Sequence, residues 1–122
     1  MPTYDAPKPL SDLLLAEVHP GWSKDTAPFA AGAVYPQGTV LALVSGKYQA
    51  LDPAGTGDSK KSRAVAAETV DATAGDKPGV VIARGAVVEA SSLVWPAGAT
   101  DAQKATSITE LEARGIVVRT SL

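Results

Sequence analysis

Residues 38–51 read GTVLALVSGKYQAL, two β-rich runs separated by a short turn signal. The first run, 38–44, is rich in Val and Leu, and the second, 47–51, follows directly after Ser45-Gly46. Two such runs joined by a Gly-containing pair are typical of a β-hairpin. We therefore expect a hairpin at the centre of a β-rich fold.

Further strands are predicted on both sides of this hairpin. Residues 80–84 (VVIAR) form the clearest β run, and we expect Gly85 to act as a bulge before the run continues over 86–89. Residues 63–69 fit a strand or a short helix, and we favour a strand. A terminal strand is expected over 116–119.

One helix is predicted near the C-terminus. Thr100 precedes Gln103 by three residues, which is the spacing of a capping box. Gly115 offers the left-handed residue that ends a helix. The residues expected on its inner face are Ala105, Ile108, Leu111 and Glu112. The residues therefore predict an α+β fold that is mostly β.

The N-terminal region has a different character. Residues 1–9 (MPTYDAPKP) contain three prolines, which exclude a helix and favour an extended arm. Residues 13–18 (LLLAEV) form a continuous apolar run that predicts a strand covered on both faces, by the domain or by another chain. We expect an extended arm over 1–20 and a β-rich domain over 21–122.

Composition limits the function classes. The chain has 122 residues, 6 of them aromatic, and a net charge of −2, so we expect one domain with a light core. Its only basic cluster is Lys60, Lys61 and Arg63, which is too small for a phosphate backbone, and we expect no nucleic acid partner. There is no cysteine, no apolar run of membrane-spanning length and no signal peptide pattern. We therefore expect no membrane partner and no export.

The chemistry-bearing residues do not form a recognisable catalytic pattern. His19 is the only histidine, and no nucleophile motif accompanies it. The carboxylates near it lie in extended chain, where solvated charges explain them better than a metal site. Lys47 stands at a hairpin tip without the neighbours of a biotinyl or lipoyl lysine. We expect no catalytic residue, metal or cofactor, and Trp22 is a candidate interface residue.

Several segments, taken in order, resemble one known family. They are 13–17 (LLLAE), 38–41 (GTVL), 45–48 (SGKY), 52–54 (DPA), 70–74 (VDATA), 76–78 (DKP), 80–84 (VVIAR) and 93–96 (LVWP). This series is similar to that of the phage head decoration proteins, the lambda-type protein D group. The resemblance covers roughly residues 10–119 and adds a barrel-like core to the expected fold: a small single-domain, mostly β α+β fold with one C-terminal helix and an extended N-terminal arm.

The resemblance implies a cementing role on the virion. It implies a homotrimer, made in the host cytoplasm, that binds the major capsid protein on the outer surface of the expanded head at local threefold sites and stabilises the lattice against internal DNA pressure. The residues expected to contact the capsid are Leu13, Leu14, Leu15, Glu17 and Trp22. The residues expected at the trimer interface are Trp95 and Pro96.

Two other classes remain open. One is a glycan- or receptor-binding surface module, which would use Trp22 and Tyr48. The other is a small phage hydrolase or a carrier domain modified at Lys47.

Overall fold

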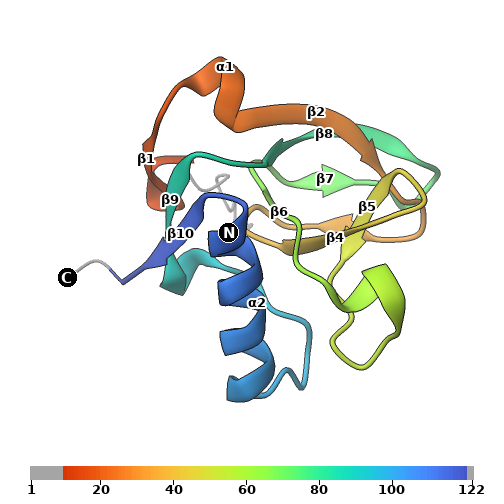
Figure 1. Ribbon diagram of the computed structural model, residues 1–122. Coiled ribbons are helices and arrows are strands. Elements are labelled where there is room, and N and C mark those ends of the chain that lie inside the picture. The colour runs from red at the N-terminus through yellow and green to blue at the C-terminus, as the bar shows by residue number, and fades with distance from the viewer. Residues whose placement is uncertain (1–9, 121–122) are drawn as a thin grey trace, which may run out of the picture.

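The computed structural model describes residues 10–120, in which five strands close into a barrel in the order β2-β5-β4-β6-β8 (Figure 1). The barrel strands are β2 (Lys24–Phe29), β4 (Val40–Val44), β5 (Lys47–Ala50), β6 (Ala64–Ala66) and β8 (Lys77–Ile82). The others are β1 (Leu14–Glu17), β3 (Val34–Tyr35), β7 (Val70–Asp71), β9 (Ala86–Glu89) and β10 (Ile116–Arg119). The expected class, mostly β and barrel-like with one main C-terminal helix, is confirmed.

The predicted hairpin is β4 and β5. These strands pair antiparallel from Leu41 opposite Ala50 to Val44 opposite Lys47. Ser45 and Gly46 both have positive φ, at 52° and 81°. Positive φ at both central residues belongs to the turn type whose twist matches that of a hairpin.

Strand β2, which the sequence analysis did not predict, closes the barrel. It pairs antiparallel with β8 along its whole length and meets β5 in parallel at Phe29 opposite Tyr48. Pro28 lies opposite Pro78 in this register. Because neither proline has an N–H, the pair must occupy a position where facing residues exchange no hydrogen bonds.

Alternate faces of the barrel strands supply two apolar clusters. One contains Phe29, Leu41 and Val81, with the Phe29 ring 5.2 Å from that of Tyr35 and 6.1 Å from that of Tyr48. The other lies between the barrel and the remaining sheet, and its members are Leu13, Val40, Ala42, Leu51, Val65, Ala67, Ile82, Ala86, Val88, Leu93, Leu111 and Ile116. We call the cluster around Phe29 the inner core cluster and the cluster that contains Leu13 and Leu111 the outer core cluster.

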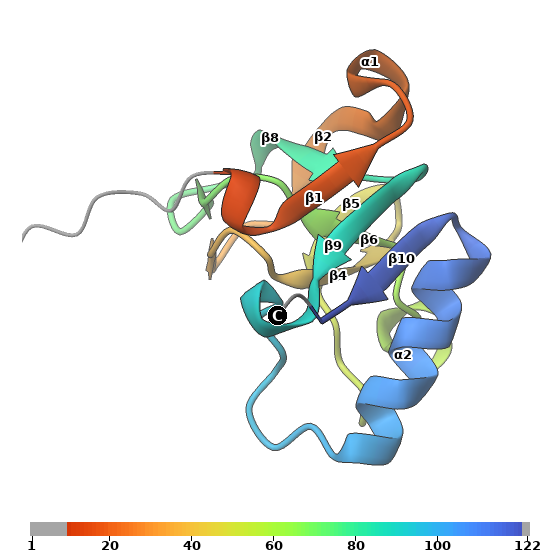
Figure 2. The same ribbon diagram turned by 90° about the vertical axis from the view of Figure 1, so that its left-hand side faces the viewer.

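The second sheet has the order β1-β9-β10, with β9 antiparallel to β1 and parallel to β10 (Figure 2). The run over 80–89 is therefore not one bulged strand. Gly85, at φ +59°, lies where the chain leaves the barrel and enters this sheet. An irregularity in register occurs instead in β1, between Leu14 and Ala16.

The expected arm over 1–20 does not coincide with a boundary in the fold. Residues 10–20 form a 3₁₀ turn (Leu10–Asp12), strand β1 and the start of α1 (Pro20–Ser23). Leu13 is only 1% exposed. The arm expected over residues 1–9 lies outside the described residues.

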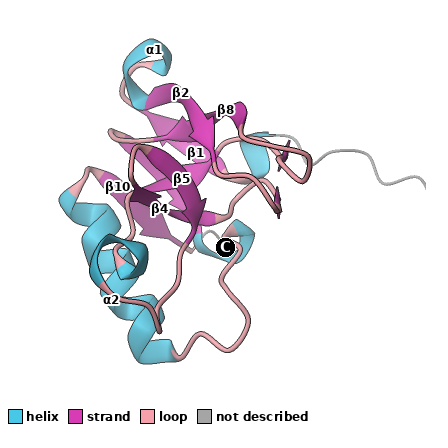
Figure 3. Cartoon of the chain, turned by 90° about the vertical axis from the view of Figure 1, so that its right-hand side faces the viewer, coloured by secondary structure: helices cyan, strands magenta, loops and turns pink. Residues whose placement is uncertain are grey.

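Helix α2 (Asp101–Ala113) begins and ends as predicted. The Thr100 hydroxyl accepts the Gln103 N–H and the Gln103 side chain accepts the Thr100 N–H, which completes the capping box. The inner face is narrower than expected, since Ser107 and Leu111 are buried and Ala105 is exposed. Helices α1 and α2 stand at opposite ends of the molecule (Figure 3). Two further 3₁₀ turns are Gly57–Lys60 and Ala90–Ser92.

Candidate functional site

The corner formed by α1 holds the most prominent exposed aromatic ring. The Trp22 and Ser23 N–H groups donate to the His19 carbonyl, at 3.0 and 2.8 Å, and Pro20 begins the turn. Trp22 remains 51% exposed. Its ring lies directly on the Gly85 backbone, because a Cβ at Gly85 would stand 2.1 Å from Trp22 Cζ3. The ring is therefore held in place while one side stays open to solvent.

Arg84 fixes this corner from the barrel side. Its Nη2 lies 2.6 Å from Asp25 Oδ2 and its Nη1 lies 3.1 Å from Asp25 Oδ1, a two-point pairing. Nη1 also donates to the Trp22 carbonyl, and the guanidinium lies 5.8 Å from the Trp22 ring centre. The hydrogen bond from Arg84 lowers the pKa of Asp25, so the pair is charged at neutral pH.

Exposed apolar side chains precede this corner along the chain. Leu15 is 40% exposed and Val18 is 75% exposed. We call Leu15, Val18 and Trp22 the β1–α1 ridge. A shallow hollow of about 310 Å³ adjoins it, lined by Val18 together with Val87 and Val117 of the neighbouring strands. Three large exposed apolar side chains within eight residues of one another, beside an apolar hollow, make this region a candidate protein interface.

The five residues expected at a capsid contact divide between the ridge and the interior. Leu13 lies in the core, and Leu14 is half-buried and packs against it. Leu15 and Trp22 are exposed. Glu17 is half-buried, with Oε1 3.1 Å from Lys24 Nζ. Val18 was not among the candidates, although the apolar run over 13–18 contains it.

Trp95 and Pro96 occupy a separate surface. Both are half-buried, and Trp95 packs against the outer core cluster. They line an apolar hollow of about 190 Å³ beside Val34 and Val94, both of which are exposed. We call this set the Trp95 groove.

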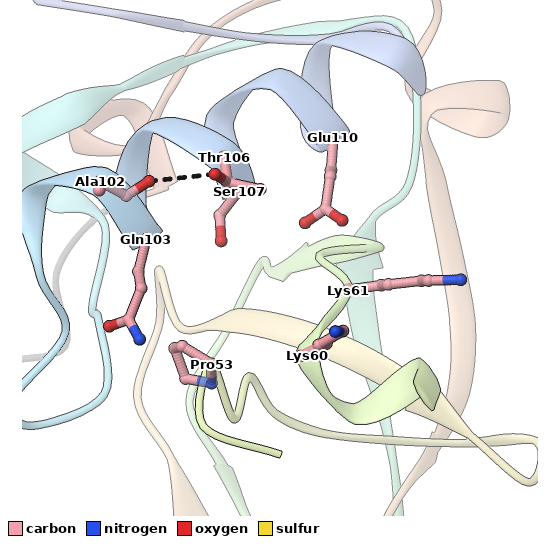
Figure 4. Close-up of a pocket in the computed structure, with 8 residues that line it drawn as sticks. All are labelled: Pro53, Lys60, Lys61, Ala102, Gln103, Thr106, Ser107 and Glu110. Carbon is pink, nitrogen blue, oxygen red and sulfur yellow. Dashed lines mark hydrogen bonds between the residues drawn. The ribbon is translucent and has the colours of Figure 1, made fainter. Parts of the chain in front are cut away.

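A further hollow of about 300 Å³ lies between α2 and the turn over Gly57–Lys60 (Figure 4). Its carboxylate, Glu110, accepts the Ser62 N–H at 3.0 Å. The Thr106 hydroxyl donates to the Ala102 carbonyl of the same helix. These groups stabilise the helix and the turn, and they provide no paired acid and base.

The residues considered for other chemistry are dispersed. Lys47 forms an ion pair with Asp76, which also accepts the Ala31 N–H at 2.9 Å. His19 is exposed at the start of α1. Within residues 10–120, no three potential metal ligands gather, and no helix has the length and apolar character needed to cross a membrane.

A model of a known family matches most of the chain. The family model described as bacteriophage lambda head decoration protein D matches residues 3–116. The matched range extends through the barrel and to the first residue of β10. No curated protein matches the sequence.

Proposed function

Because the chain belongs to the bacteriophage lambda head decoration protein D family, we propose that it binds as a trimer to the outer surface of the expanded phage head. There it would occupy local threefold sites and stabilise the lattice of the major capsid protein against internal DNA pressure. The family match over residues 3–116 is the observation that carries this proposal. Members of this family are capsid decoration proteins of the virion.

The β1–α1 ridge is the proposed capsid contact. β1 is an edge strand, so one side of its backbone is available for pairing with another chain. Leu15 within β1 and Val18 just after it are exposed, and Trp22 follows in α1 with its ring held against Gly85. Aromatic anchors held in place before binding lose little conformational entropy when a partner covers them. Glu17 and residues 1–9 extend the proposed contact.

The Trp95 groove is the proposed contact between copies. It is apolar, and it lies apart from the ridge on segments that include β3 and the start of β4. A trimer needs such a second surface, since the surface that holds the capsid cannot also hold the neighbouring copy.

Cosedimentation with expanded, undecorated heads tests the proposal. We expect saturable binding of the full chain, and at least a tenfold loss of affinity in the double variant Val18→Asp/Trp22→Ala. The matched control, Ala102→Asp, adds the same charge on an exposed position of α2 and should bind normally.

Failure of the full chain to bind heads would contradict the decoration role. If the double variant Val18→Asp/Trp22→Ala binds heads as tightly as the wild type, the capsid contact lies on another surface of the chain. Binding of the full chain to a glycan array would favour the surface-module alternative.

A further inference from the structure

Two polar hollows of about 340 and 350 Å³ adjoin each other and share Arg63 and Arg114. Arg63 precedes β6 and Arg114 caps the C-terminus of α2. Arg84 and Tyr48 line the first hollow, and Ser62 lines the second. We call these five residues the arginine groove. None of these five residues belongs to the ridge or to the Trp95 groove, and the first hollow borders the ridge at Trp22.

Two of the three guanidinium groups in this groove have no anionic partner. Arg84 is paired with Asp25. Within residues 10–120, the side chains of Arg63 and Arg114 form no ion pair and donate no hydrogen bond. Guanidinium groups present several N–H donors in a planar fork that fits the two oxygens of a carboxylate.

Two hydroxyl groups that line the hollows point to the same kind of ligand. Most of the Tyr48 side chain is buried, but its hydroxyl is not among the buried polar atoms, so it faces the hollow. The Ser62 hydroxyl is buried and has no hydrogen-bond partner among the described residues. Burial raises the pKa of Tyr48, so its hydroxyl keeps the proton and can donate it to an acceptor. Buried polar groups are almost always paired, and the Ser62 hydroxyl is an exception that lines the same hollow as Arg63 and Arg114.

We propose that the arginine groove binds a side-chain carboxylate, and that this carboxylate belongs to an acidic segment of the neighbouring major capsid protein. This inference rests on the proposed function for the identity of the partner. The chemistry favours a protein carboxylate over a nucleic acid backbone. Lys61 and the three arginines line the hollows together with Asp25 and Asp58, so carboxylates interrupt the cations and a row of phosphates would meet negative charge.

A peptide titration tests the groove without the capsid. The probes are a blocked hexaglutamate peptide and the corresponding hexaglutamine peptide, and the readout is the NMR signal of the arginine Nε–H groups. We expect saturable shifts at Arg63 and Arg114 with the glutamate peptide only. Those shifts should disappear in the variant Arg63→Gln/Arg114→Gln.

Three results would overturn the proposal at this stage. They are the absence of saturable shifts, equal shifts with the glutamine peptide, and shifts spread evenly over exposed cations outside the groove. Displacement of the peptide by a short single-stranded DNA at equal phosphate concentration would reassign the groove to nucleic acid.

Binding to expanded heads tests the partner. We expect Arg63→Gln/Arg114→Gln to weaken binding at least tenfold and to reduce its dependence on salt. The matched control is Lys60→Gln/Lys77→Gln, which removes two exposed charges outside the groove and should stay within twofold of the wild type. Thermal melting checks that both variants fold.

The outcomes separate the two proposals. If the wild type and the groove variant bind heads equally, the groove proposal fails and the decoration role stands. If the groove variant instead loses self-association, the carboxylate comes from a second copy and the capsid partner is wrong. If the wild type does not bind heads at all, the decoration role fails, and the peptide titration alone decides whether the groove takes a carboxylate.

Discussion

At the scale of single residues, Gly85 and Trp22 depend on each other. Gly85 has φ +59°, and Trp22 occupies the space that a side chain would need. We expect Gly85→Ala to destabilise the fold by about 1–2 kcal/mol through the left-handed backbone and to displace the Trp22 ring. Urea unfolding and tryptophan emission measure the two effects.

Gly57 provides the matched control for this substitution. Its φ of +62° is nearly the same, and no atom lies within 4 Å of the added Cβ. Gly57→Ala should therefore show the backbone cost without any change in emission. An unchanged emission spectrum in Gly85→Ala would show that the backbone of Gly85 does not hold the ring.

The Asp25–Arg84 pair gives a prediction about pH. Arg84 lowers the pKa of Asp25 in the folded state, so the stabilisation is complete above the pKa of the unfolded carboxyl, about 4, and is lost as pH falls through the lower folded value. Both side chains are partly exposed, which limits the effect to about 1 kcal/mol at pH 7. Asp25→Asn should be less stable than the wild type at pH 7 and nearly equal to it at pH 2. The measurement is the urea midpoint at each pH, and a difference that persists unchanged at pH 2 would contradict it.

At the scale of elements, β1 both completes the core and presents the ridge. Leu13, just before the strand, is buried, whereas Leu15 within it is exposed. We expect Leu13→Ala to cost about 2–5 kcal/mol of stability, because it leaves a cavity in the outer core cluster. Leu15→Ala should cost less than about 1 kcal/mol and should weaken head binding. Denaturation and cosedimentation of the two variants compare the two roles, and a large stability loss in Leu15→Ala would place that side chain in the core.

Which elements could be predicted depends on where their stability comes from. The hairpin and α2 carry local signals, namely the Ser45-Gly46 turn and the Thr100 cap. Both elements could therefore be predicted from the sequence. β2 carries none, since its sequence KDTAPF is polar and contains a proline. It is a strand because β8 pairs with it along six residues, and that contact is distant in sequence.

The candidate sites also could be predicted only where a local sequence signal marks them. Trp22 could be singled out because an aromatic residue in a polar loop is unusual. The arginine groove could not be predicted, because Arg63, Arg84 and Arg114 lie far apart in sequence and meet only in the folded chain. Leu13 looked equivalent to Leu15 in the apolar run, and only the register of β1 and the path of the chain before it place one inside and the other outside.

At the scale of the whole molecule, the ridge and the Trp95 groove are separate surfaces, so the proposed capsid contact and the proposed contact between copies can be changed one at a time. The proposed trimer would hold the capsid through three copies of one contact, which multiplies a modest affinity by effective concentration. We therefore expect Val34→Asp, which places a charge in the Trp95 groove, to weaken head binding by about 100-fold while its ridge remains intact. Because Val34 is exposed, the melting temperature should change little.

Val18→Asp is the control for that experiment, because it adds the same charge to an exposed valine on the ridge. Cross-linking of the head-bound chain should yield trimers for the wild type and for the remaining bound fraction of Val18→Asp, but not for Val34→Asp. The two variants would then lose binding for different reasons, one through a weaker contact and the other through the loss of its neighbours. Trimers and wild-type affinity in Val34→Asp would show that the copies meet through a different surface.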